Sequence, residues 1–242
     1  MGRVKIAKKS TFIDMTAMSD VTVLLLTFFM LTSTFLSKEP ATVITPPSVS
    51  EEKVQETNYV QVLVNPEGKI WLTMNNDTSS NWSNEKMKKA LLEKVSEIYN
   101  ESHKSKPVNF SVAQKDAFAK LGSFGVPLAQ MGEFLDLADQ PEGQTKMDKW
   151  LEGTDGNPNH VTGIPISKEG SDANPDEFQM WMKAMRQSAN TNLVDKIKDG
   201  SGVAIKADQN TSFEVIHTVM DNLQSIHMNK FTLLTALKGA AE

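Results

Sequence analysis

The stretch "MSDVTVLLLTFFMLTSTF", residues 18–35, decides how this chain is organised. It lies in a run of 22 residues, 15–36, in which Asp20 is the only formal charge. A helix of that length spans roughly 33 Å at about 1.5 Å per residue, close to the thickness of a bilayer's hydrocarbon core. The pattern therefore predicts a single transmembrane helix over residues 15–37.

The charges on either side of this segment predict its orientation. Lys38 and Glu39 cancel directly after it. Four basic residues come before it: Arg3, Lys5, Lys8 and Lys9. The positive-inside rule then places residues 1–14 in the cytoplasm and the chain after residue 37 on the outer side. A cleaved signal peptide also has a basic start and an apolar core, but the exit from this segment has no small-x-small cleavage pair, which favours a retained anchor.

Composition excludes several classes of function. The 242 residues carry a net charge of -5 and no long basic stripe, which argues against a nucleic acid partner. The absence of cysteine excludes disulfides and thiolate metal sites. The chain also has no P-loop, no G-x-S-x-G motif and no cysteine nucleophile, so we expect neither an enzyme nor a bound cofactor.

A polar segment, "TDGNPNH" (154–160), has part of the spacing of a calcium loop. Asp155, Asn157 and Asn159 fit, but His160 stands where that loop needs glycine and Ile166 where it needs its final glutamate. We therefore expect a polar turn. The four histidines form no i,i+4 pair, and no metal site is expected.

Residues 38–58 predict an extended linker between the membrane and a folded domain. Pro40, Pro46 and Pro47 each lack a backbone donor and favour an extended chain. The segment has little hydrophobic periodicity and several Ser and Thr residues, which are typical of a tether.

The rest of the chain, 59–242, predicts an α+β periplasmic domain, a small sheet with helices on one face. Alternating apolar and polar residues and turn residues in "NPEG" (65–68) indicate a hairpin, and Thr211-x-x-Glu214 is a capping-box signature that predicts the start of a helix. The expected elements are strands at 59–64 and 69–73, a helix at 84–99, a strand at 202–208, a helix that starts at the Thr211 cap, and a closing strand at 230–237.

The middle of the domain, about 101–199, predicts a mainly helical insertion. Helical spacing indicates short helices at 116–121 and 127–138 and a longer one at 174–198, capped by Asn174. The glycine content of 140–173 is typical of a loop.

Asp20 is the residue that calls for a chemical explanation. An acid near a membrane span costs about 2.5–3.5 kcal/mol even on the lenient insertion scale, and such residues usually face a partner or a wet path. Removal from water favours the protonated carboxyl, so a proton can be loaded and released as access to water changes. Alternatively, Asp20 is only a charge near the helix N-terminus, where the macrodipole favours an acid.

The segment "IDMTAMSDVTVLLLTFFMLTSTF" (13–35) resembles the signature of the ExbD/TolR family, proton-driven energisers of bacterial inner membranes, in which a Thr-Pro-x-x-Asp-Val element opens a single span. The matched positions are Asp14, Thr16, Asp20, Val21, Leu24, Leu25, Phe29 and Met30. Segments 42–49 and 204–235 also look like the family's linker and closing strand-helix-strand. Ala17 replaces the usual proline, and 101–199 has no counterpart in the short members.

The resemblance, closest to ExbD, implies a motor subunit. It implies a homodimer whose spans sit inside a ring of an ExbB/TolQ-like partner, with a TonB-like transducer outside. Asp20 would carry the proton and Thr16 would mark the helix entry. From side-chain chemistry alone, we expect Thr22, Thr27 and Thr32 to hydrate or hydrogen-bond in the ring interior. Thr45, Pro46 and Pro47 are expected to form a partner-binding linker.

Three functions remain open from the sequence. The first is energising TonB-dependent outer-membrane transport from the inner membrane. The second is a TolR-like role in envelope maintenance, or a motility or secretion motor built on the same span. The third is a passive, membrane-anchored periplasmic binding domain in which Asp20 is structural.

Overall fold

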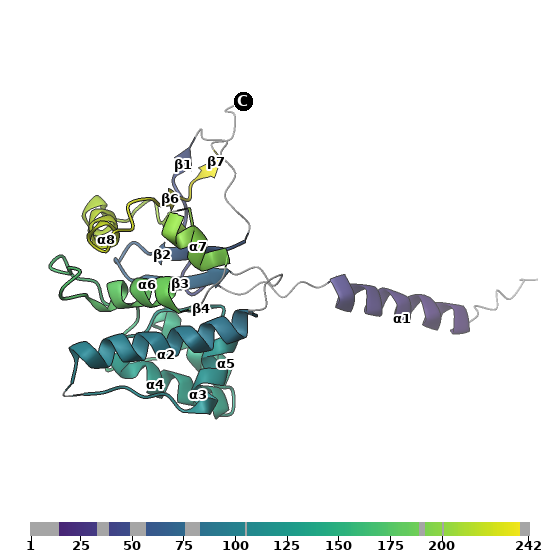
Figure 1. Ribbon diagram of the computed structural model, residues 1–242. Coiled ribbons are helices and arrows are strands. Elements are labelled where there is room, and N and C mark those ends of the chain that lie inside the picture. Colours follow the sequence, from purple (N-terminus) through teal and green to yellow (C-terminus); the bar gives the residue numbers. More distant parts are fainter. Residues whose placement is uncertain are drawn as a thin grey trace, which may run out of the picture. The chain divides into compact units, whose positions relative to one another are not determined.

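The computed structural model describes residues 15–32, 39–48, 57–75, 83–104, 106–188, 192–199 and 201–237. The chain divides into two compact units, Met1–Lys38 and Glu39–Glu242. The described part of the first unit is one helix, α1 (Met15–Thr32) (Figure 1).

All the α1 side chains that the structure describes are exposed within the chain. Among the described residues, no helix combines the length and the hydropathy needed to cross a membrane. The predicted span continues beyond α1 into residues 33–37, which lie outside the described part of the chain. The span therefore stays a prediction.

A five-stranded mixed sheet forms the centre of the second unit, with the order β4-β3-β2-β5-β6. β2 pairs antiparallel with β3 and parallel with β5, β3 pairs antiparallel with β4, and β5 pairs parallel with β6. The strands are β2 (Tyr59–Val64), β3 (Ile70–Asn75), β4 (Ser123–Phe124), β5 (Val203–Ala207) and β6 (Thr232–Leu233). The α+β class is confirmed.

The predicted hairpin is confirmed, and its turn chemistry explains it. Val64 pairs with Ile70. The Gly68 N–H donates to the Asn65 carbonyl over 3.0 Å, and the Asn65 side-chain oxygen accepts from Lys69 N over 2.8 Å. Gly68 has φ +79°, a left-handed conformation that glycine adopts at little cost.

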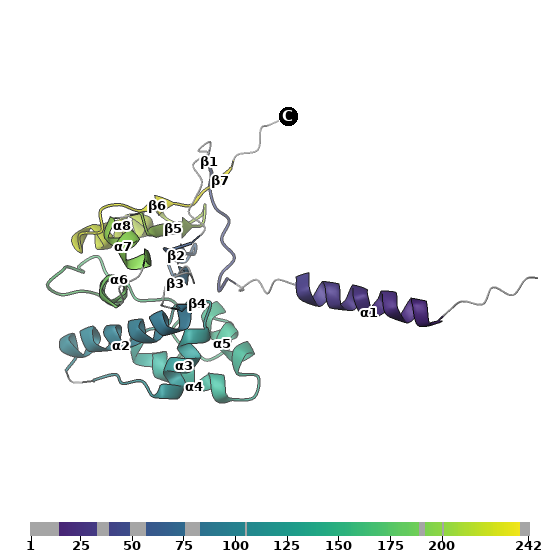
Figure 2. The same ribbon diagram turned by 45° about the vertical axis from the view of Figure 1, so that its right-hand side comes forward.

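The described residues of this unit contain seven further α-helices and one 3-10 turn. They are α2 (Asn84–Ser102), α3 (Val112–Lys120), α4 (Leu128–Asp136), the 3-10 turn Leu137–Asp139, α5 (Gly143–Glu152), α6 (Glu177–Gln187), α7 (Asn192–Asp199) and α8 (Phe213–Ser225). Figure 2 shows β5, β2, β3 and β4 stacked from top to bottom with α6, α7 and α8 to one side.

Helices are not confined to one face, and this corrects the prediction. Leu63 of β2 pairs with Trp71 of β3 on one side and with Lys206 of β5 on the other, so the three residues share the sheet face opposite Leu72. On that face the Trp71 indole N–H donates to the Leu151 carbonyl of α5 over 3.2 Å. Lys206 there forms an ion pair of 2.6 Å with Glu39.

Two predicted helix starts are wrong. α6 begins after Asp176, not Asn174, because Asp176 and Gln179 form a capping box in which each side chain accepts from the other residue's N–H. α8 is capped by Ser212, whose hydroxyl accepts from Glu214 N over 3.3 Å, whereas Thr211 is buried.

The boundaries of three other predicted segments also change. The expected loop 140–173 contains α5. The expected helix 174–198 is divided between α6 and α7, and residues 189–191 lie outside the described part. The expected closing strand 230–237 is divided between β6 and β7 (Ala236–Leu237), and β7 pairs parallel with β1 (Pro47–Ser48) in a separate two-stranded sheet.

One hydrophobic core unites the strands with the helices on either side of residue 101. Trp181 of α6 has ring centroids 5.8 Å from Phe118 and 4.7 Å from Phe124, and all three side chains are fully buried. The predicted insertion, 101–199, thus shares its core with β2, β3 and β5.

Candidate functional site

The polar residues of α1 fall on different faces of the helix. At about 100° per residue, Thr16 and Thr27 lie within about 40° of Asp20, whereas Thr22 and Thr32 lie about 160° and 120° away. The predicted polar residues of α1 therefore do not form one stripe. Only Thr16 and Thr27 share the Asp20 face.

The threonine hydroxyls of α1 are bonded within the helix. Thr22 donates to the Met18 carbonyl over 2.7 Å and Thr32 to the Phe28 carbonyl over 2.8 Å. Thr27 donates to the Val23 and Leu24 carbonyls over 3.0 and 2.9 Å. These bonds let a hydroxyl lie on an apolar helix without an unpaired donor, while the oxygen lone pairs remain able to accept.

Asp20 is the one charged residue in the α1 sequence, and it lies in the second turn. It is five residues past Met15, about 7.5 Å along the axis. The attraction between an acid and the helix dipole fades beyond the first turn, so the dipole gives Asp20 little stabilisation there. This position weakens the alternative in which Asp20 is only a helix-end charge.

The predicted linker residues contact the folded unit of the chain itself. Thr45 and Pro46 are half-buried, and Pro47 pairs with Ala236. Next to them the Ile44 N–H donates to an Asp208 carboxylate oxygen over 2.7 Å, and the Ile44 carbonyl accepts from Gln209 N over 2.8 Å.

Asp208 and Glu39 were missed as anchors of this segment. Backbone N–H groups of Asn210 and Ile44 hold the pKa of the Asp208 carboxyl below its usual range. Glu39 anchors the other end through Lys206. The pairs are separated by 164 and 167 residues, so local patterns carry no signal for them.

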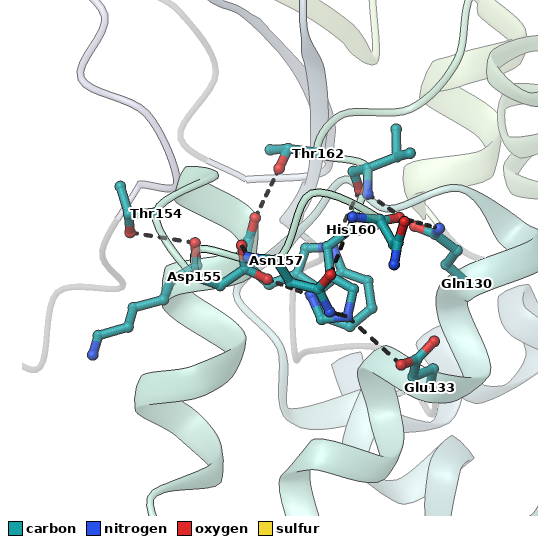
Figure 3. A network of polar contacts seen from close by, with 11 residues as sticks. Gln130, Glu133, Thr154, Asp155, Asn157, His160 and Thr162 are labelled. Carbon is teal, nitrogen blue, oxygen red and sulfur yellow. Dashed lines mark hydrogen bonds and ion pairs between the residues drawn. The ribbon is translucent and has the colours of Figure 1, made fainter.

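The segment 154–160, which has part of the spacing of a calcium loop, lies in a polar loop, 153–163, that follows α5. His160 contacts Asp155 through Nδ1 and Asn157 through Nε2, and its ring stacks on Trp150 (Figure 3). Within the described ranges, no group of three or more His, Asp or Glu residues has an arrangement that could hold a metal ion.

A family model described as biopolymer transport protein ExbD/TolR matches residues 7–123. Residues 7–123 therefore form an ExbD/TolR family domain. Members of this family are inner-membrane proteins that act in biopolymer transport with ExbB/TolQ-like partners. No curated protein and no solved structure matches the chain.

The extent of the match bears on two predictions. It contains Asp20, the four threonines of α1 and the linker positions 45–47. It also contains residues 101–123, so the predicted start of the insertion falls inside the family segment. It ends before 204–235, and the predicted likeness of that segment to the family stays a prediction.

Proposed function

We propose that this chain is the proton-carrying motor subunit of an inner-membrane energiser that drives TonB-dependent outer-membrane transport. The observation that carries the proposal is Asp20, the single charge on an apolar helix, in the second turn and inside the family segment. A carboxyl in that position can be loaded and released as its access to water changes.

The proposed topology follows the sequence. Residues 15–37 span the inner membrane, residues 1–14 are cytoplasmic, residues 38–58 form the periplasmic linker, and residues 59–242 form the periplasmic domain. Two copies lie inside a ring of an ExbB/TolQ-like partner, and a TonB-like transducer takes up the work. One charge falling through 100 mV releases about 2.3 kcal/mol, so a few protons suffice for a mechanical step.

The Asp20 face of α1 defines the proton path in this proposal. Thr27 is nearest to that face, and its two carbonyl bonds leave the hydroxyl oxygen able to accept from water. Thr16 lies one turn before Asp20 on the same side. Thr45, Pro46 and Pro47 remain the proposed contact for the transducer.

The test is uptake of an iron chelate or cobalamin in the native host, comparing wild type with Asp20→Asn at matched protein levels. The amide keeps the size and polarity of the side chain but cannot cycle a proton. We expect uptake to fall to the level of a null strain while the complex with the ring partner still purifies.

Two other outcomes would redirect the proposal. If Asp20→Asn leaves uptake intact but makes cells detergent-sensitive or non-motile, the motor serves envelope maintenance or motility. If neither process changes, Asp20 is structural and the chain is a passive anchored binding domain.

A further inference from the structure

His160 is held between α4 and α5 in a setting that the proposed function does not use (Figure 3). Its ring lies flat on Trp150, with centroids 3.5 Å apart and planes 1° apart. Its side chain is 15% exposed. The ring is therefore fixed in place but still within reach of protons from solvent.

The hydrogen bonds around the ring define its protonation state. Asn159 N donates to the Asn157 side-chain oxygen over 3.1 Å, so the Asn157 amide nitrogen faces the ring, where it lies 2.9 Å from Nε2. That nitrogen is a donor, so Nε2 is an acceptor. The ring proton is then on Nδ1, which donates to Asp155, and the imidazole is neutral.

A second partner lies close to Nε2. A Glu133 carboxylate oxygen of α4 is 3.6 Å from it, just beyond hydrogen-bonding distance. Once Nε2 gains a proton it becomes a donor and can no longer accept from Asn157. Glu133 is then the acceptor within reach.

The groups that face the ring favour the charged form. Asp155 faces it from its own loop and Glu133 from α4, and both are acids. α5 contributes the neutral Trp150 ring, whose face attracts a cation. Histidine as a residue type ordinarily changes charge between about pH 5 and 8, which sets the pH range for a test.

We propose that His160 is a proton-operated clamp that exchanges Asn157 for Glu133 and, in mildly acidic solution, adds a second tie between loop 153–163 and α4 to the one that Gln130 makes. The loop is already joined to the sheet region, because Gly163 N donates to the Gly125 carbonyl over 2.7 Å and Ile164 N to the Ile70 carbonyl over 2.8 Å. The Gln130 side chain of α4 also holds the loop, because it donates to the Asn159 carbonyl over 2.8 Å and accepts from Val161 N over 2.9 Å. Protonation of His160 adds a charged contact to these neutral bonds and makes this part of the domain more rigid. The clamp is independent of the energiser function.

The test is amide hydrogen exchange in loop 153–163 of the full-length chain in detergent, at about pH 7.5 and about pH 5.5, corrected for intrinsic rates. We expect exchange at Val161 and Gly163 to slow by about two- to fivefold at the lower pH, the range of a partly exposed ion pair. Glu133→Gln and His160→Gln should each abolish the slowing. His217→Gln, which removes the imidazole paired with Asp221 on α8, should keep it.

Imidazole ¹⁵N shifts provide a second readout that survives if a variant is unstable. At about pH 7.5 the wild-type His160 should carry its proton on Nδ1 alone. A proton already on Nε2 at that pH would overturn the proposal. Loop exchange that does not change with pH would also overturn it, as would full slowing in Glu133→Gln.

Discussion

The threonines of α1 have the same side-chain chemistry, but they differ in where they lie around the helix relative to Asp20. Thr22 and Thr27 are the same residue type and both donate to carbonyls of their own helix, Thr22 to one and Thr27 to two, but they lie about 160° and 20° from Asp20. We expect Thr27→Val to lower proton-driven uptake several-fold, because the variant loses a hydroxyl oxygen on the Asp20 face, about two turns further along α1. Thr22→Val is the control and should stay close to wild type. Equal uptake defects in the two variants would show that the Asp20 face is not the proton path.

A second prediction at the scale of single residues concerns Gly125, at the close approach between β3 and the loop after β4. A Cβ atom there would lie 2.2 Å from the Trp71 ring. We expect Gly125→Ala to lower the free energy of unfolding by about 1–3 kcal/mol through overpacking. Urea unfolding of the full-length chain, followed by tryptophan fluorescence, measures this.

The matched control is Gly132→Ala in α4, where the nearest heavy atom is the Gln114 side-chain nitrogen at 3.7 Å. Alanine is a better helix former than glycine by about 0.5–1 kcal/mol, so this variant should be neutral or stabilising. A destabilisation as large as that of Gly125→Ala would rule out the close contact with Trp71 as the cause.

At the scale of elements, a side chain of α6 caps the N-terminus of α4. Pro127 precedes α4 and offers no side-chain cap, and the Leu128 N–H donates instead to a Glu177 carboxylate oxygen over 2.9 Å. Burial raises the pKa of Glu177 above its usual range, and the bond from Leu128 only partly offsets that effect. The folded chain therefore holds this proton more tightly than the unfolded chain does.

The sign of the pH dependence follows from this raised pKa. Protonated Glu177 stabilises the folded chain, and this stabilisation is complete below the usual glutamate pKa near 4.5. It is lost as the pH rises through the higher pKa that Glu177 has in the folded chain. We expect wild type to lose stability relative to Glu177→Gln between about pH 4.5 and about pH 7.5 in urea unfolding.

The control for this series is Asp116→Asn. Lys89 lowers the pKa of Asp116 below its usual value near 3.8, so Asp116 titrates outside that pH range and should add no slope. A wild-type curve parallel to that of Glu177→Gln would contradict the raised pKa.

The elements that the sequence predicted well are those with local causes. The hairpin depends on Asn65 and Gly68, and α2 depends on its apolar spacing and the Ser83 cap. α5 was missed because it follows Glu142 in a left-handed conformation and has no capping side chain. Its signal was the spacing of Met147, Trp150 and Leu151, which are buried.

At the scale of the whole molecule, the contacts that were not predicted join distant segments. The Glu39–Lys206 pair, the bond between Ile44 and Asp208, and the pairing of β1 with β7 all connect residues more than 160 positions apart. In the candidate site, one unusual charge in an apolar run was enough to single out Asp20 from the sequence, and its proton chemistry stays a prediction. Which threonines share a face with Asp20 becomes clear only when they are placed on the helix α1.

The shared core gives a prediction at this scale. Residues 101–199 supply β4, which pairs with β3, and the fully buried Phe118, Phe124 and Trp181. Removing a single buried aromatic side chain costs about 3–5 kcal/mol, and ordinary domains have only about 5–15 kcal/mol of stability. We expect a short linker in place of 101–199 to abolish cooperative unfolding, as measured by circular dichroism and proteolysis. A protease-resistant, cooperatively unfolding product would show that this segment is a separable insertion.

The most direct measurement of the central claim is proton flux through the complex of this chain with its ring partner, reconstituted in vesicles with an imposed potential and a pH-sensitive dye inside. Wild type should acidify the interior faster than empty vesicles, and Asp20→Asn should reduce the rate to that of empty vesicles while the complex stays intact. Asp20→Glu, which keeps a carboxyl, should retain part of the flux. Equal flux in wild type and Asp20→Asn would contradict the assignment of Asp20 as the proton carrier.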